Sequence, residues 1–169
     1  MANLAPTLEF GPNFIWTMAR GQGWRLETRV PVRGALTLAR SPKVVGFVTT
    51  PNINFDIVIQ GWDFGVYVGP VFATRKQNGY YYDVPVSDAT VSRPAYQSGG
   101  GYAGSQLVFG TSKRFGNAWV GAFGKFDHLA GASFADSPLV RRKQNFAFGV
   151  GASWVFWQSA RPAPTPHGK

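Results

Sequence analysis

One group of charged residues has the spacing of a polar face on an extended strand. Three arginines and a glutamate within residues 24–38 all occupy odd-numbered positions, so on a strand their side chains would point to the same side. Guanidinium groups on one face need water, anions or carboxylate partners. The residues predicted to line this interior are Arg25, Glu27, Arg29, Arg33, Asp56 and Asp63. Such a lining either selects anions or forms an internal ion network, which is favoured because side chains fill the interior of a small barrel.

Two other patterns offer weaker chemistry. Residues 99–104 match the G-x-G-x-x-G fingerprint of dinucleotide sites, which requires a strand before the glycines and a helix after them. A proline-containing loop precedes this stretch and an alternating segment follows it, so we expect a transition from loop to strand. Asp127, His128 and Asp136 are thin evidence for a metal centre, because structural sites use about four ligands and catalytic sites about three at fixed spacing. The sequence predicts no catalytic residue, no cofactor and no metal site.

The composition narrows the class of protein. Aromatic residues make up 15% and glycine supplies 21 positions, while charged residues are 15% rather than the usual ~25%, so the chain is expected to fold. The absence of cysteine excludes disulfides and thiolate sites. A net charge of +9 suits nucleic acid, an anionic membrane surface or phosphate-bearing lipids. Nucleic acid is not favoured, because the rings share strand faces with aliphatic residues rather than with cations.

Alternation with a period of two residues recurs in segments of about ten residues, the length that lets a tilted strand cross a bilayer. No apolar run reaches the ~18 residues of a membrane-spanning helix, and we expect no helix of useful length. In the last segment, the predicted lipid-facing residues are Phe146, Phe148, Val150, Trp154 and Phe156. Seven strands are predicted, over residues 7–18, 24–38, 53–59, 62–69, 102–114, 118–128 and 144–156.

The connections between these segments alternate in length. Short turns are expected near residues 19–23, 60–61 and 115–117, and long loops at 39–51, 74–101 and 129–143. Short turns at one rim and long loops at the other are typical of bacterial outer-membrane barrels. The predicted fold is therefore all-β, an antiparallel up-and-down transmembrane β-barrel of outer-membrane type over residues 1–157. A flexible proline-rich tail is expected over residues 158–169.

The barrel is expected to be incomplete at its N-terminus. The first ten residues lack the basic region and apolar core of an export signal. Both termini of an even-stranded barrel lie in the periplasm. If the last strand descends to the periplasm, so does the first of the seven, which places the N-terminus outside. At least one preceding strand is then expected.

Basic residues gather in or beside the long loops. They are Arg40, Lys43, Arg75, Lys76, Arg93, Arg141, Arg142 and Lys143. Arginine suits the phosphates of lipopolysaccharide, whereas the alternative is ordinary solvated loop charge. The candidates for contacts at the outer rim are Asp136, Arg141, Arg142 and Lys143. Expected partners are therefore outer-membrane lipid and lipopolysaccharide.

Four stretches resemble the MipA/OmpV family of Gram-negative outer-membrane proteins. They are GWRLETRVPVR at residues 23–33, RPAYQSGGGYAGSQL at 93–107, WVGAFGKFDHLAGASFADSPLVRR at 119–142 and GVGASWVF at 149–156. The resemblance implies a barrel in the cell outer membrane with no enzyme activity. It also implies a scaffold that brings a lytic transglycosylase and a murein synthase together in peptidoglycan synthesis.

Other functions stay open. A barrel for transport or adhesion is the main alternative, and a soluble β-barrel binder is a further one. The partner surface is also open, because a periplasmic partner needs the short turns or the tail, whereas the family-like stretch at residues 127–142 is expected at the outer rim.

Overall fold

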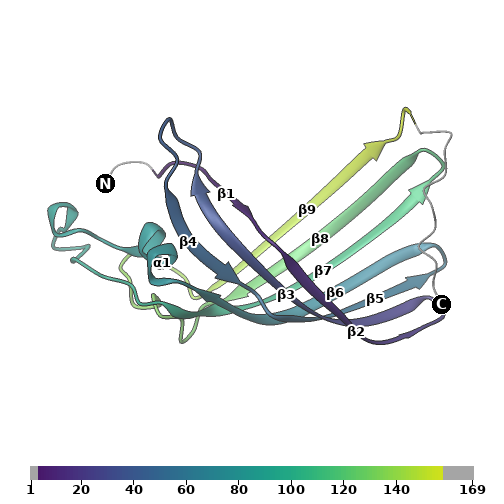
Figure 1. Ribbon diagram of the computed structural model, residues 1–169, viewed down its shortest axis with the longest axis horizontal. Helices are drawn as coiled ribbons and strands as arrows, with labels where there is room; N and C mark the ends of the chain where they lie inside the picture. The colour runs from purple at the N-terminus through teal and green to yellow at the C-terminus, as the bar shows by residue number, and fades with distance from the viewer. Residues whose placement is uncertain (1–3, 158–169) are drawn as a thin grey trace.

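The alternating segments form one antiparallel sheet (Figure 1). The computed structural model describes residues 4–157, so the predicted tail at 158–169 lies outside the described residues. The prediction of an all-β antiparallel architecture is confirmed. The strands are β1 (Thr7–Phe10), β2 (Asn13–Gly21), β3 (Trp24–Thr37), β4 (Val44–Thr49), β5 (Asn52–Ile59), β6 (Trp62–Ala73), β7 (Gly101–Phe115), β8 (Ala118–His128) and β9 (Gln144–Trp154).

Two of the long strands are each divided by a break that contains a proline. β1 and β2 both pair with β3, and β4 and β5 both pair with β3 and β6. Pro12 lies between β1 and β2, and Pro51 lies between β4 and β5. Proline lacks the N–H group that would continue the ladder. Seven strands therefore stand side by side, the number that the alternation predicts.

A short helix corrects the expectation that the chain contains none of useful length. α1 (Arg75–Tyr82) follows β6, and a 3-10 turn, η1 (Val86–Asp88), follows α1. The side chain of Thr74 caps the helix by accepting a hydrogen bond from the backbone N–H of Gln77. The expectation failed because Gly79 interrupts the helical pattern, whereas tertiary packing of the tyrosines stabilises the helix. In residues 4–157, no helix has the length and apolar character needed to cross a membrane.

β4 corrects the prediction of a long loop over residues 39–51. Pro42, Gly46 and Pro51 are residue types typical of loops, but residues 44–49 pair with β3 and β6 and pack against α1. The connection between β3 and β4 is therefore only residues 38–43. The other connections keep the predicted alternation, since residues 22–23, 60–61 and 116–117 form short turns, and 74–100 and 129–143 form long ones.

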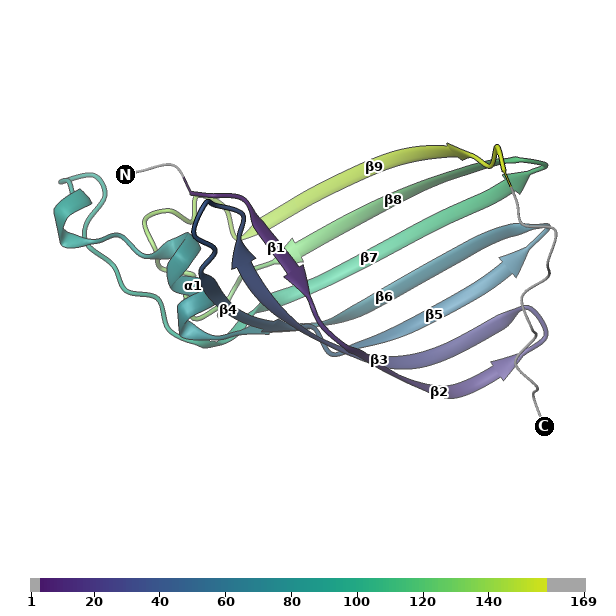
Figure 2. The same ribbon diagram turned by 45° about the horizontal axis from the view of Figure 1, so that its top comes forward.

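The register separates the side chains into two faces. Polar and small residues of neighbouring strands stand opposite one another, as in the pairs Arg25–Asp56, Asp56–Gly65 and Gly65–Gly110. The intervening positions carry apolar residues, as in the pair Phe126–Phe146. Figures 1 and 2 show the sheet strongly bent, with β1 and β4 turning away from the tilted strands β6 to β9. We call the polar face the inner face and the apolar face the outer face.

The two edges of the sheet are not joined within the described residues. β1 and β2 form one edge, and β9 forms the other. Six successive antiparallel pairings separate the edges, so their strands run in the same direction. Few apolar side chains are buried. The main buried cluster lies at the end of the sheet that carries the long connections, and consists of Ala73, Ala103, Ala132, Phe134 and Ala135.

Gly46 provides a test of the contact between β4 and α1. Its φ of +152° disfavours other residues, and an added Cβ would lie 2.7 Å from the backbone nitrogen of Gln77. Gly46→Ala is expected to lower the free energy of unfolding by about 1–3 kcal/mol and to expose residues 74–100 to proteases. The measurement is urea unfolding in detergent with limited proteolysis. Gly151→Ala is the control, because a Cβ there meets nothing within 4 Å. Equal stability of the two variants would contradict this packing.

Candidate functional site

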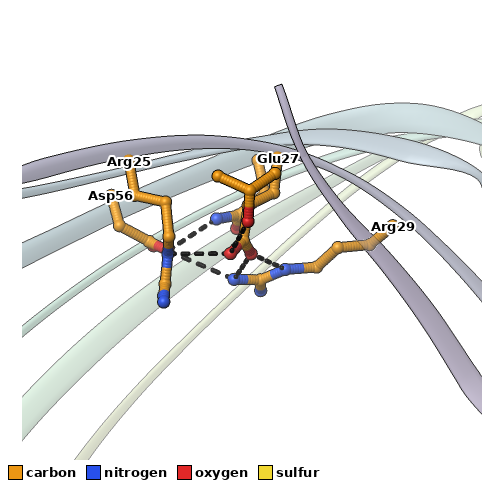
Figure 3. A network of polar contacts seen from close by, with 6 residues as sticks. Arg25, Glu27, Arg29 and Asp56 are labelled. Atoms are coloured by element: carbon orange, nitrogen blue, oxygen red, sulfur yellow. Dashed lines mark hydrogen bonds and ion pairs between the residues drawn. The ribbon is translucent and has the colours of Figure 1, made fainter. Parts of the chain in front are cut away.

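Four charged side chains meet on the inner face near the short turns (Figure 3). β3 contributes Arg25, Glu27 and Arg29, and β5 contributes Asp56, which stands opposite Arg25 in the register. The Glu27 carboxylate accepts hydrogen bonds from Arg29 Nε at 2.9 Å and Nη2 at 2.7 Å, and pairs with Arg25 Nε at 2.9 Å. Asp56 Oδ2 accepts from Nη2 of Arg25 at 3.0 Å and of Arg29 at 3.1 Å.

The network balances its own charge. Two guanidinium groups face two carboxylates, and the Glu27 side chain is only 5% exposed. Asn54 adds a hydrogen bond to Asp56 Oδ2 at 2.7 Å. A nearly buried carboxylate is tolerated only when it is paired in this way. The arrangement has the geometry of an internal ion network, and it neutralises two of the three arginines that share this face of β3.

The two remaining residues of the predicted lining lie outside this network. Asp63, on β6, and Arg33, further along β3, form no ion pair with any residue in the described range 4–157. Asp63 borders a hollow of about 720 Å³ on the inner face that also contacts the network. Arg33 borders a second hollow of about 480 Å³, between the sheet and α1.

α1 and its contacts were missed in the sequence. Thr7 Oγ1 and Tyr81 OH are 2.8 Å apart, Tyr80 OH donates to the Ala5 carbonyl at 2.8 Å, and the ring of Tyr82 stacks on Phe134 with centroids 3.8 Å apart. These contacts connect the helix to the edge strand β1 and to the connection at 129–143. A capping-box signature at residues 74–77, Thr-Arg-Lys-Gln, was the signal that could have predicted the helix start.

The phenol of Tyr82 is perturbed by this packing. Burial raises the pKa of Tyr82 above its ordinary value, and the negative charge of Asp127 raises it further. The hydroxyl group therefore stays protonated beyond the usual pH range. Tyr82 is thus suited to packing against Phe134 rather than to proton transfer near neutral pH.

The predicted contacts of the outer rim lie in the connection at 129–143. Lys143 Nζ lies 3.7 Å from an oxygen of Asp136, whose side chain is 91% exposed. Arg141 and Arg142 are exposed and have no ion pair with another residue between 4 and 157. The same connection is anchored by Ser137, whose hydroxyl donates to the Tyr82 carbonyl at 2.7 Å.

The predicted lipid-facing residues of the last segment lie on the outer face, with one difference. Phe146, Phe148, Val150 and Trp154 belong to β9, and their exposed fractions lie between 65% and 85%. β9 ends at Trp154, so Phe156 follows the strand rather than belonging to it. Phe156 is 93% exposed.

The other sequence patterns fall into ordinary structural positions. Gly101 begins β7 without a following helix, so residues 99–104 lead from a loop into a strand. Asp127 pairs with Lys125 at 3.1 Å, and His128 stacks near Phe126. Between residues 4 and 157, no three His, Cys, Asp or Glu side chains are grouped to hold a metal ion.

A family model described as MltA-interacting protein MipA matches residues 1–156. The chain belongs to the MipA family. The resemblance found in the sequence is therefore confirmed. The family takes its name from an interaction rather than from a reaction. Comparison with curated proteins and with solved structures finds no match.

Glu27 tests the ion network. Glu27→Gln is expected to lower the free energy of unfolding by about 2 kcal/mol, because two guanidinium groups lose a nearly buried charged acceptor. Asp63→Asn is the matched control, since Asp63 has no ion pair in residues 4–157, and its effect should stay within about 0.5 kcal/mol. Urea unfolding in detergent measures both. A loss at Asp63 as large as that at Glu27 would contradict the network.

Proposed function

We propose that this MipA-family chain forms the wall of an outer-membrane β-barrel that acts as a non-enzymatic scaffold in peptidoglycan synthesis. In this role it brings a murein hydrolase, a lytic transglycosylase of the MltA type, together with a murein synthase. The family name supports the first partner. The scaffold positions other proteins and carries out no catalytic step itself.

The observation that carries the membrane assignment is the apolar outer face. Large apolar side chains are exposed on it from one edge of the sheet to the other, including Phe14 at 64%, Phe109 at 53% and Val150 at 85%. A water-soluble protein rarely exposes a continuous apolar surface of this extent. If hydrocarbon surrounds the outer face and polar groups are confined to the inner face, the free-energy cost of exposing apolar side chains to water is removed.

The short-turn rim carries side chains suited to a membrane interface. Lys113 Nζ lies 5.5 Å from the ring centroids of both Trp62 and Phe115, and donates to the Gln60 carbonyl at 3.0 Å. Trp24 and Trp154 stand at the same rim, beside turns or strand ends. Rings and lysines at this level are typical of the boundary between hydrocarbon and headgroups. In the proposed orientation, this rim faces the periplasm, where the murein enzymes act.

The opposite rim is proposed to face lipopolysaccharide. Arg141, Arg142 and Lys143 are exposed in the connection at 129–143, where their charges can meet lipid phosphates. Transport is the second candidate function, and the hollow of about 720 Å³ on the inner face favours it. Adhesion is favoured by residues 84–96, where Val86 and Val91 are almost fully exposed.

The membrane assignment predicts that folding requires an amphiphile. The full chain should gain its strand content in detergent micelles or lipid vesicles and should aggregate in buffer alone, because the exposed outer face is apolar. Circular dichroism and size-exclusion chromatography provide the measurement. A well-folded monomer in buffer without detergent would exclude the proposed function.

The scaffold assignment predicts that the short turns bind the enzymes. In detergent, the immobilised full chain should retain a purified MltA-type transglycosylase. The variant Gln22→Glu with Asn117→Glu should reduce retention about tenfold, because new charges at an interface must be desolvated. The matched control, Ser41→Glu with Ser92→Glu, places the same charges in connections at the opposite rim. Equal retention by both variants would place the partner elsewhere, and no retention by the parent chain would contradict the scaffold role.

A further inference from the structure

We propose that a hollow on the outer face of β1, β3 and β4 binds an acyl chain of lipopolysaccharide, with a phosphate of the same molecule on Arg40 and Lys43. The proposal rests on the proposed function, which places the outer face in hydrocarbon. It adds a defined lipid site at the sheet edge opposite β9.

The hollow has a volume of about 320 Å³ and an almost wholly apolar lining. β1 contributes Phe10, β3 contributes Val32 and Leu36, and β4 contributes Val44 and Phe47. Its volume lies at the lower end of ordinary ligand pockets, which span about 300–1000 Å³. A narrow apolar ligand therefore fits better than a polar or bulky one.

Two local features keep this space open. The break at Gly11 and Pro12 separates β1 from β2 at the border of the hollow. Gly34, near the C-terminal end of β3, provides no side chain, and a Cβ built there would meet only the ring of Phe47, at 3.3 Å. By contrast, the ring of Phe109 covers Gly124 on β8. The outer face is thus filled by a ring at Gly124 and is left hollow at Gly34.

An acyl chain is the occupant that this chemistry selects. Water is disfavoured, since a water molecule in a cavity needs two to four polar partners. An empty hollow would deprive its lining atoms of dispersion contacts. In hydrocarbon, the methylene chain of a lipid supplies those contacts.

The charge beside the hollow selects a phosphorylated lipid. Lys43 directly precedes Val44, and Arg40 lies in the same connection, residues 38–43. Both are exposed, and neither forms an ion pair with any residue between 4 and 157. The positive charges and the apolar hollow together match a lipid with a phosphate and acyl chains. In the proposed orientation, this connection lies in the outer leaflet, where the phosphorylated lipid is lipopolysaccharide.

Retention of lipid by the full chain in detergent tests the site. Lipopolysaccharide or phosphatidylethanolamine is added separately, excess lipid is removed by washing, and native mass spectrometry counts the bound molecules. The parent chain should retain lipopolysaccharide in preference to phosphatidylethanolamine. Gly34→Leu should reduce this retention at least about tenfold, because displacing two methylene groups from apolar contact already costs about that factor. Ala152→Leu, which adds the same side chain to the outer face of β9, should retain lipid like the parent chain.

A charge variant keeps the test independent of packing at Gly34. Arg40→Glu with Lys43→Glu should reduce retention of lipopolysaccharide about tenfold, while the matched reversal Arg20→Glu with Arg114→Glu, beside the short turns at the opposite rim, should leave retention unchanged. Equal retention by the folded parent and Gly34→Leu chains would overturn the site, as would a preference for phosphatidylethanolamine. These results would leave the barrel assignment standing, because they come from chains already folded in micelles. Folding without amphiphile would instead remove the proposed function, and this site with it.

Discussion

The register of the antiparallel ladder is the constraint on which the other features of this protein depend. Side chains alternate with a period of two, so each pairing fixes which residues share a face. The pair Arg25–Asp56 places both charges on the inner face, and the pair Phe126–Phe146 places both rings on the outer face. A slip of one residue would exchange the faces of a strand and separate the charges. The ion network and the apolar outer face therefore reinforce the same register from opposite sides.

The end with the long connections is organised differently from the rest of the sheet. Along β5 to β9 the sheet is a single layer with an inner and an outer face. At the end with the long connections, α1 and residues 129–143 instead build a small core around Phe134 and Tyr82. Hydrogen bonds from Asn78 to the Gly99 carbonyl and to Ser133 satisfy polar groups in that core. With the connections packed at this end, the hollow between the sheet and α1 has a volume of about 480 Å³, whereas the hollow near the short turns has a volume of about 720 Å³.

The sequence predicted features that depend on strand periodicity and missed those that depend on contacts between distant segments. Alternation identified the strands and placed Arg25, Glu27 and Arg29 on one face. It did not show that Asp56 pairs with them while Asp63 does not, because that choice depends on the register between β3 and β5. β4 was missed because it lies between Pro42 and Pro51 and contains Gly46, residue types typical of loops, although pairing on both sides and contact with α1 stabilise the strand. The hollow at Gly34 is lined by residues of three strands, so the pattern of no single strand could predict it.

The shared direction of the two sheet borders sets a rule for how the sheet can become a cylinder. A direct seam between β9 and β2 would be parallel, with evenly spaced and slanted hydrogen bonds. A seam made only of antiparallel ladders requires an odd number of inserted strands, whichever polypeptide supplies them. The alternating direction of the strands therefore restricts closure by antiparallel pairing to assemblies with an even total number of strands.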